Sequence, residues 1–385
     1  MSTIAKLGAI ILFWLAIGLI QTFNWGSGVP KAVVMLLVLA AVPFALAAAR
    51  KPVAPLAPAL ARTVAIAFWL CLALNLAYFG ARIVAPHVID IATTTLAAGQ
   101  ALLHGANPYA LPIDTGPEAA GFTGYKYLPA MIAAYLPLGA SLGERGVLLT
   151  NLVLLLGCLA LMRQLAGARL APLLLLMLPL VAEQIFAKGA TDLAAVLPLL
   201  AGLALVGRSS FWCGVCVGLS ISTKLLPGAA MLPALIPAER RGHYAAGVAV
   251  GLLPILPFLI AGPRSFIDNI VLFNLARFPD DTSWLHALPP AIATVAHVVL
   301  AAGMVAAALY VWRSNPPIAA RSGIAAMLGI ASILAGPGAH HNYQLWWLPF
   351  YAILLSHALA PPRGEACQAR RFGYTSGAEA DAKGV

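Results

Sequence analysis

Long apolar runs separated by short polar stretches follow one another along almost the whole chain. Each run has about 16 to 24 residues, enough for a helix to cross roughly 30 Å of hydrocarbon. The runs are continuous in Leu, Ala and Val and lack the alternation of a transmembrane β-strand. The pattern predicts an all-α polytopic membrane protein with about 11 to 13 membrane segments. The apolar segments lie near residues 7–21, 32–49, 63–86, 127–143, 147–162, 170–187, 190–207, 211–236, 243–262, 289–312, 320–336 and 343–359.

The composition supports this class. Of the 385 residues, 61% are hydrophobic and only 9% are charged, so the chain lacks the polar side chains that would cover a water-soluble core. The formal net charge is +10, but the basic residues gather in short loops, where they act as topology signals. The charge therefore does not indicate a nucleic-acid partner.

Basic residues also predict the orientation. They gather in the loops at residues 50–62, 239–241 and 313–321 and in the tail, which the positive-inside rule places in the cytoplasm. The first apolar segment is expected to be a retained helix, because no small-residue cleavage site follows it. Threading from a cytoplasmic N-terminus then places the unusual polar segments on the outer face, at residues 87–126, 263–288 and 337–342.

One apolar segment, at residues 127–143, fits the topology poorly as a full crossing. A full crossing would place Arg163 and Arg169 outside. A re-entrant or interfacial helix between Pro129 and Pro137 would return both arginines to the cytoplasm, in agreement with the positive-inside rule. We therefore expect the re-entrant form, with the full crossing as the alternative.

The segment at residues 211–236 is long for one crossing and carries a cluster of Ser, Thr and Lys at residues 220–224, followed by Pro227. Broken helices at membrane depth are tolerated where they line a polar cavity. The pattern thus predicts two short arms that meet at Lys224. The alternative is a lysine that snorkels to the interface.

The first outer segment begins with the most informative acid of the chain. Asp90 directly follows an apolar span, and a carboxylate at a membrane edge is a candidate catalyst. Residues 88–104 predict an amphipathic helix, and GANPYALP, which contains Tyr109, predicts an irregular turn. The later tyrosines, including Tyr127, are typical either of an interfacial belt or of a wall that stacks on sugar.

The other outer segments carry further candidates. His340 and His341 come just before the last crossing; adjacent residues point in different directions on a helix, so anion binding is favoured over metal binding. The loop at 263–288 contains Arg277, Asp280 and Trp284. These side chains either are solvated and have no role in function, or they contact the acceptor or another substrate.

Several short motifs occur in a fixed order: an acid after an early membrane helix, G-x-N-P-Y (residues 105–109), Tyr-x-Tyr-x-Pro (125–129), Gly-x-x-Asp (189–192), K-L-x-P (224–227) and H-H-x-Y (340–343). This order, over about residues 80–358, resembles glycosyltransferase family 87. That family includes polyprenyl-phosphate-mannose-dependent α-mannosyltransferases and has the GT-C membrane fold.

The resemblance implies roles for individual residues. Asp90 matches the general base. Lys224, His341 and His340 match residues that bind the donor phosphate. The positions implied to bind substrate are Tyr109, Tyr127, Lys188, Asp192 and Trp284. The chain departs from the family pattern at residues 189–192 and around Asp90, and these departures bear on the identity of donor sugar and acceptor.

The expected function is sugar transfer, most simply of mannose, from a polyprenyl-phosphate donor to a lipid or glycan hydroxyl. One base without a nucleophile predicts a single displacement with inversion. No nucleotide-binding glycine loop, cofactor or metal is expected. The expected location is a bacterial inner membrane, with the site on the periplasmic face. The alternative is a lipid or sugar transporter, which should show inverted repeats and charges near mid-membrane.

Four parts are expected along the chain. Residues 1–62 form two transmembrane helices and a cytoplasmic loop, and residues 63–262 form the catalytic module with the outer loop 87–126. Residues 263–360 form a C-terminal membrane module. Residues 361–385 form a cytoplasmic tail that is expected to be disordered.

Overall fold

The computed structural model describes Trp14 and residues 28–49, 58–114, 121–277, 280, 282–338 and 340–359. Throughout these residues the chain forms helices joined by turns, without a strand. This agrees with the predicted all-α class. The predicted helix at 7–21, apart from Trp14, and the predicted tail at 361–385 lie outside the described residues.

The helices follow one another with short connections. The α-helices are α2 (Gly28–Ala49), α3 (Pro58–Val84), α4 (Asp90–Leu103), α5 (Pro129–Leu142), α6 (Glu144–Ala166), α7 (Leu170–Leu176), α8 (Pro179–Ala182), α9 (Leu193–Leu205), α10 (Ser210–Thr223), α11 (Leu225–Met231), α12 (Arg241–Gly251), α13 (Leu256–Ala261), α14 (Pro263–Ile267), α15 (Phe273–Ala276), α16 (Pro290–Ser314), α17 (Ile318–Leu334) and α18 (Gln344–Leu359). Single π or 3₁₀ turns are η2 (Glu183–Ala187), η3 (Leu232–Leu235), η4 (Leu253–Ile255), η5 (Asp268–Leu272), η6 (Trp284–Ala287) and η7 (His341–Tyr343).

Four helices of the described part are long and apolar enough to cross a membrane: α3, α6, α16 and the stretch Arg241–Ala261. A fifth results if Leu170–Leu176 and Pro179–Ala187, which meet at a bend of 70°, form one broken span. The other apolar helices are shorter. The predicted membrane segments therefore appear as four or five long spans and a set of short helices, because prolines and polar residues interrupt many of the runs.

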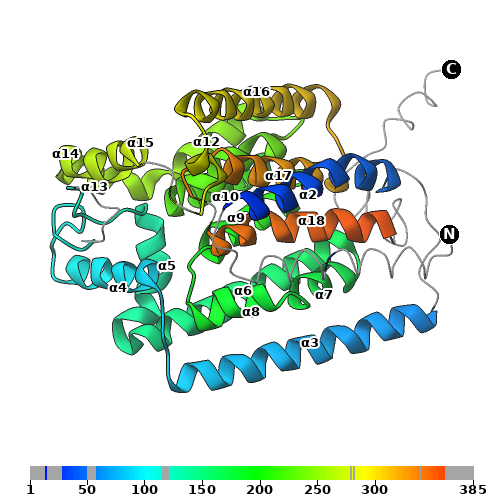
Figure 1. Ribbon diagram of the computed structural model, residues 1–385, viewed down its shortest axis with the longest axis horizontal. Helices are drawn as coiled ribbons and strands as arrows, with labels where there is room; N and C mark the ends of the chain where they lie inside the picture. Colours follow the sequence, from blue (N-terminus) through cyan, green and yellow to red (C-terminus); the bar gives the residue numbers. More distant parts are fainter. Residues whose placement is uncertain are drawn as a thin grey trace.

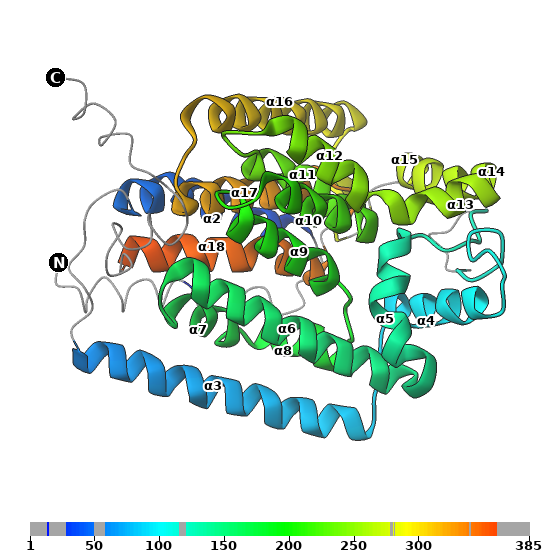
Figure 2. The same cartoon turned by 180° about the vertical axis from the view of Figure 1, so that it is seen from behind.

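The outer surface of the bundle is apolar. Helices α3 and α16 lie on opposite sides of it (Figures 1 and 2), and the most apolar window of α16 has no buried residue. Large exposed side chains such as Leu74 and Val299 cover these two helices. Such a surface is unfavourable in water but matches hydrocarbon. Aromatic residues fill the interior, with Trp347 and Phe350 of α18 fully buried.

The contact between α10 and α12 is unusually close because both helices present glycines to each other. A Cβ atom added at Gly214 would lie 2.1 Å from the Tyr244 carbonyl oxygen, and one at Gly218 would lie 2.3 Å from the Val248 carbonyl oxygen. Small residues four apart are the usual means of bringing two membrane helices into backbone contact. This packing fixes α10, whose C-terminal end leads into Lys224.

The polar segments gather at one end of the bundle. Figures 1 and 2 show α4, α5 and the α13 to α15 stretch together there. In both views α5 lies across the direction of α3, and its 14 residues span only about 21 Å. A short helix in this orientation favours the predicted re-entrant or interfacial form of residues 127–143.

Candidate active site

A cavity of about 340 Å³ lies where the polar segments meet. Each of the three predicted outer segments contributes to its lining, and so does the junction between α10 and α11. Segments far apart in the sequence thus enclose one space. The polar and aromatic side chains that line it are Asp90, Asp114, Lys126, Tyr127, Lys224, Phe273, Asn274, Arg277, Ser332, Tyr343 and Trp346.

Lys224 occupies the predicted break in the long apolar segment. Helix α10 ends at Thr223, the backbone of Lys224 is extended (φ −148°, ψ 121°), and α11 begins at Leu225. The prediction of two short arms meeting at Lys224 is therefore confirmed. The lysine is only 8% exposed, so it does not snorkel to the surface.

The Lys224 ammonium is held by a buried carboxylate. Its Nζ lies 2.7 Å from Oδ1 of Asp192, which is fully buried. The same carboxylate accepts hydrogen bonds from Trp346 Nε1 (2.6 Å) and Asn342 Nδ2 (2.7 Å). A buried charge pair is stable when further hydrogen bonds satisfy its atoms. Asp192 does not line the cavity, so it acts on the site through Lys224.

Aromatic rings surround the same ammonium. Nζ lies 4.8 Å from the ring centroid of Tyr343, 5.3 Å from that of Trp346 and 5.6 Å from that of Tyr127. These distances permit cation–π attraction. Burial, followed by the proximity of Tyr343 and Asp90, raises the pKa of Tyr127 well above its usual value, so its phenol stays neutral.

Asp90 is the first residue of α4, which covers most of the amphipathic helix predicted at residues 88–104. Its side chain is exposed, and its backbone oxygen accepts hydrogen bonds from the Thr93 and Thr94 hydroxyls at 3.0 and 2.8 Å. Among the described residues, none donates a hydrogen bond to its carboxylate. The carboxylate is thus accessible to a group that enters the cavity, and the helix N-terminus stabilises its negative charge.

Asp114 and Lys126 also line the cavity, although sequence reasoning gave neither a role. The predicted site has Asp90 as its one catalytic carboxylate, whereas two carboxylates, Asp90 and Asp114, line the cavity. Lys126 is buried and donates to the carbonyl oxygens of Phe122 and Gly124 and to Asn269 Oδ1. Burial lowers its pKa, and the charge of Asp114 opposes this shift. The only signal in the sequence that points to Asp114 and Lys126 is their position in the same outer loop as Asp90.

A charged network at the cavity joins two outer loops. Arg277 lines the cavity and donates to Asp280 Oδ2 at 2.9 Å, and His340 Nε2 lies 3.2 Å from the same oxygen. Burial alone would raise the pKa of Asp280, but hydrogen bonds from His340 and Thr282 and the charges of His340 and Arg277 bring it well below its usual range. The backbone of Asp280 also bonds to Pro337. This network fixes the position of Arg277.

Other residues predicted to bind substrate or phosphate lie outside this lining. His340 is in the Asp280 network, and His341 begins η7 next to Asn342. Tyr109 is buried and donates to the Tyr127 backbone oxygen at 2.8 Å, so it supports the segment that carries Tyr127.

Lys188 and Trp284 also lie outside the lining. The Lys188 ammonium is 3.0 Å from Glu183, and its backbone oxygen accepts from Ile89 N, which anchors the start of α4. Trp284 borders a separate apolar cavity between α2, α16 and α17 and donates to the Leu334 oxygen.

Comparison with known proteins decides the family. The profile of Glycosyltransferase family 87 matches residues 125–337, which is more than half of the chain. The chain belongs to glycosyltransferase family 87. The match includes Asp192, Lys224 and Arg277, whereas Asp90 and the two histidines lie outside it. It is narrower than the range of about residues 80–358 over which the motifs follow one another.

The fold of this family 87 protein is similar to that of a solved structure. ArnT from Cupriavidus metallidurans, crystallised with undecaprenyl phosphate, superposes with a TM-score of 0.53 at 17% sequence identity. The similarity covers 79% of this chain and 62% of the ArnT chain, so the protein spans less than two thirds of ArnT. At this identity the similarity shows the fold, and it confirms the predicted GT-C architecture. Among curated proteins, none matches the chain in sequence.

Proposed function

We propose that this family 87 protein transfers a sugar, with mannose as the expected one, from a polyprenyl-phosphate donor to a hydroxyl of a lipid or glycan acceptor. The proposed location is a bacterial inner membrane, with the cavity on the periplasmic face. The observation that carries the proposal is that an accessible carboxylate, Asp90, and a buried cation, Lys224, line one cavity. The presence of undecaprenyl phosphate in the ArnT structure supports a lipid-linked donor.

The proposed reaction needs a base and a cationic site around one carbon atom. The acceptor hydroxyl transfers its proton to the Asp90 carboxylate while its oxygen attacks the anomeric carbon. The bond between that carbon and the phosphate oxygen breaks, and the electron pair leaves with the phosphate. Lys224 and Arg277, both in the cavity lining, stabilise the growing negative charge.

The stereochemistry follows from this single step. The attacking oxygen and the leaving phosphate are on opposite faces of the anomeric carbon, so the configuration inverts. A β-linked sugar phosphate would give an α-glycoside. Tyr127 and Tyr343 contribute aromatic surface beside the cavity, which suits a sugar ring.

The test is to incubate the purified chain in lipid with a panel of radiolabelled polyprenyl-phosphate sugars and a bacterial lipid extract as acceptor. We expect label to pass from one lipid-linked donor into the acceptor fraction, and sugar nucleotides to give none. Transfer from a sugar nucleotide would contradict the proposal. So would the absence of transfer from every donor, if the protein is at the same time observed to move the lipid across the bilayer.

A further inference from the structure

A second polar cavity, of about 440 Å³, lies between the α9–α10 turn, the turn before α12 and the end of α16. Helix α9 starts directly after Asp192 and ends at this cavity, while α10 starts at the cavity and ends at Lys224. The two helices have 13 and 14 residues, about 20 Å each. The second cavity is therefore at the opposite end of α9 and α10 from the active-site cavity, on the side that the basic residues predict to be cytoplasmic.

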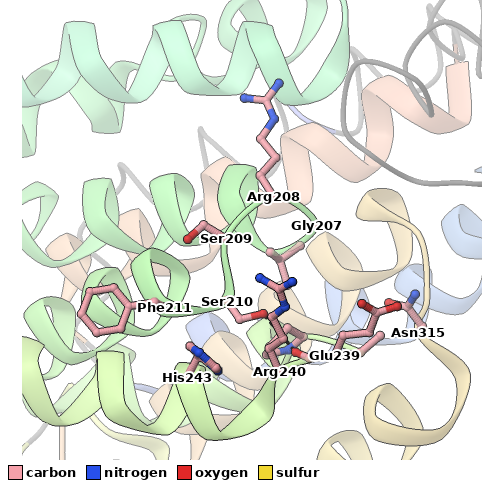
Figure 3. Close-up of a pocket in the computed structure, with 12 residues that line it drawn as sticks. Gly207, Arg208, Ser209, Ser210, Phe211, Glu239, Arg240, His243 and Asn315 are labelled. Carbon is pink, nitrogen blue, oxygen red and sulfur yellow. Dashed lines mark hydrogen bonds between the residues drawn. The ribbon is translucent and has the colours of Figure 1, made fainter.

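The lining of this cavity is suited to an anion. It includes Arg240 and His243, both exposed, and the N-terminal ends of α10 and α12. Helix N-termini present unpaired N–H groups and positive potential, which bind phosphate. In Figure 3 Arg240 and Glu239 lie next to each other near Asn315, His243 lies beside Phe211, and Arg208 points away from the other labelled side chains.

The cavity is held in shape by a buried arginine. Arg321 is fully buried and donates to the Asn315 side chain (3.0 Å) and to the backbone oxygens of Ile236 (2.8 Å) and Ala234 (2.9 Å). It thus joins two of the three segments that form the cavity and adds positive charge behind them. The Ser210 hydroxyl joins the third segment, the α9–α10 turn, to the turn before α12 by donating to the Glu239 backbone oxygen at 3.0 Å.

Two residues that line this second cavity have an unusual backbone conformation. Arg240 (φ 51°) and Asn315 (φ 42°) are the two residues other than glycine with a left-handed backbone among those that the structure describes, and both line this cavity. Asn315 in this conformation is the C-cap of α16. Arg240 thereby precedes α12, with its side chain at the helix N-terminus.

We propose that this cavity binds a phosphate-bearing anion, either the headgroup of an anionic phospholipid or a free phosphate compound. The guanidinium of Arg240 can hold two phosphate oxygens, and the two helix N-termini supply further N–H donors. Basic cavities between helices on the cytoplasmic side are typical sites for anionic headgroups. The Glu239 carboxylate opposes the anion, so its charge limits the affinity.

The test uses the full chain purified in a neutral detergent. Binding of dihexanoyl phosphatidylglycerol, of dihexanoyl phosphatidylcholine and of inorganic phosphate is measured by the shift of the melting temperature with concentration. We expect phosphatidylglycerol or phosphate to raise the melting temperature and phosphatidylcholine to have little effect. If phosphatidylglycerol alone raises the melting temperature, the site binds a lipid headgroup. If inorganic phosphate raises it equally, the site binds a free anion.

Three variants locate the effect. Arg240→Gln should weaken binding about tenfold or more through loss of a charge-assisted contact, and Glu239→Gln should strengthen it several-fold. Arg313→Gln, which removes a charge from the same side of the molecule outside the cavity, is the matched control and should bind like the unaltered protein. Equal shifts with phosphatidylcholine, or equal losses in Arg240→Gln and Arg313→Gln, would overturn the proposal.

Discussion

Asp90 and Lys224, the two groups proposed to act in the candidate active-site cavity, are held in contrasting ways. Lys224 is buried, bonded to a fully buried Asp192 and surrounded by three aromatic rings. Asp90 is exposed, and its carboxylate accepts no hydrogen bond from the residues that the structure describes. The cationic side is thus organised before any substrate arrives, whereas the carboxylate is open to a new partner.

This contrast agrees with the division of work in the proposed reaction. Stabilising a phosphate as its charge grows is most effective when the cation needs no rearrangement. Accepting a proton from an acceptor requires instead that the base can reach that acceptor within hydrogen-bond distance. The following substitutions separate the two sides, beginning with the largest expected effect.

Loss of Asp192 should disturb the protein most. Asp192→Ala leaves the buried Lys224 ammonium without its counter-ion, which costs about 3 to 5 kcal/mol in the free energy of unfolding. The matched control is Glu183→Gln, which breaks the part-exposed pair with Lys188 and should cost about 1 kcal/mol or less. Denaturant unfolding in mixed micelles measures both. Equal costs would show that the Lys224 pair is not buried as described.

Loss of the cation should act on the donor. Lys224→Met removes phosphate stabilisation and is expected to lower kcat/KM for the lipid-linked donor by about 10²-fold or more. The KM for the acceptor should change little. Arg264→Gln, in an exposed outer position away from the cavity, is the control. Equal loss for donor and acceptor would argue against a phosphate role for Lys224.

The Asp280 network should stabilise the protein in a pH-dependent way. The folded pKa of Asp280 lies below its unfolded value of about 3.9, so its contribution is complete above that value and is lost as the pH falls further. Asp280→Asn should therefore lower stability by about 2 kcal/mol at neutral pH.

Melting curves of both proteins between pH 7 and pH 3 check this. The difference between them should stay constant down to about pH 4 and shrink only below it. A difference that has already vanished at pH 5 would mean that Asp280 is not held in its charged form by His340 and Arg277.

The smallest effect is expected at Tyr109. Tyr109→Phe removes the hydroxyl that bonds to the Tyr127 backbone and should cost about 1 kcal/mol of stability. Transfer activity should be nearly unchanged if Tyr109 only supports the segment that carries Tyr127 and does not contact substrate. A large rise in the KM of either substrate would indicate instead that Tyr109 contacts substrate directly, as the family resemblance implies.

The parts of the site that could be predicted are those with a local signal. A Ser, Thr and Lys cluster before a proline marks the break at Lys224, and a polar stretch after an apolar span marks the helix that starts at Asp90. Both signals lie within a few residues of the feature itself.

The remaining parts depend on contacts between distant residues. Asp192 meets Lys224 across 32 positions and Asn342 across 150, so no spacing rule reveals that it serves as an internal counter-ion. Asp114 and Lys126 come to the cavity through the course of an irregular loop. The number of long spans was also not evident, because hydropathy does not show where a proline or a bend shortens a helix.

The most direct test of the central claim compares the two carboxylates of the cavity. Single-turnover transfer from the accepted donor is measured for Asp90→Asn and Asp114→Asn, with melting curves to establish that both variants are folded. We expect Asp90→Asn to lose about 10³-fold or more in rate, since a base contributes about 10² to 10⁴, and Asp114→Asn to lose far less. A folded Asp90→Asn variant that retains most of the rate would contradict the account.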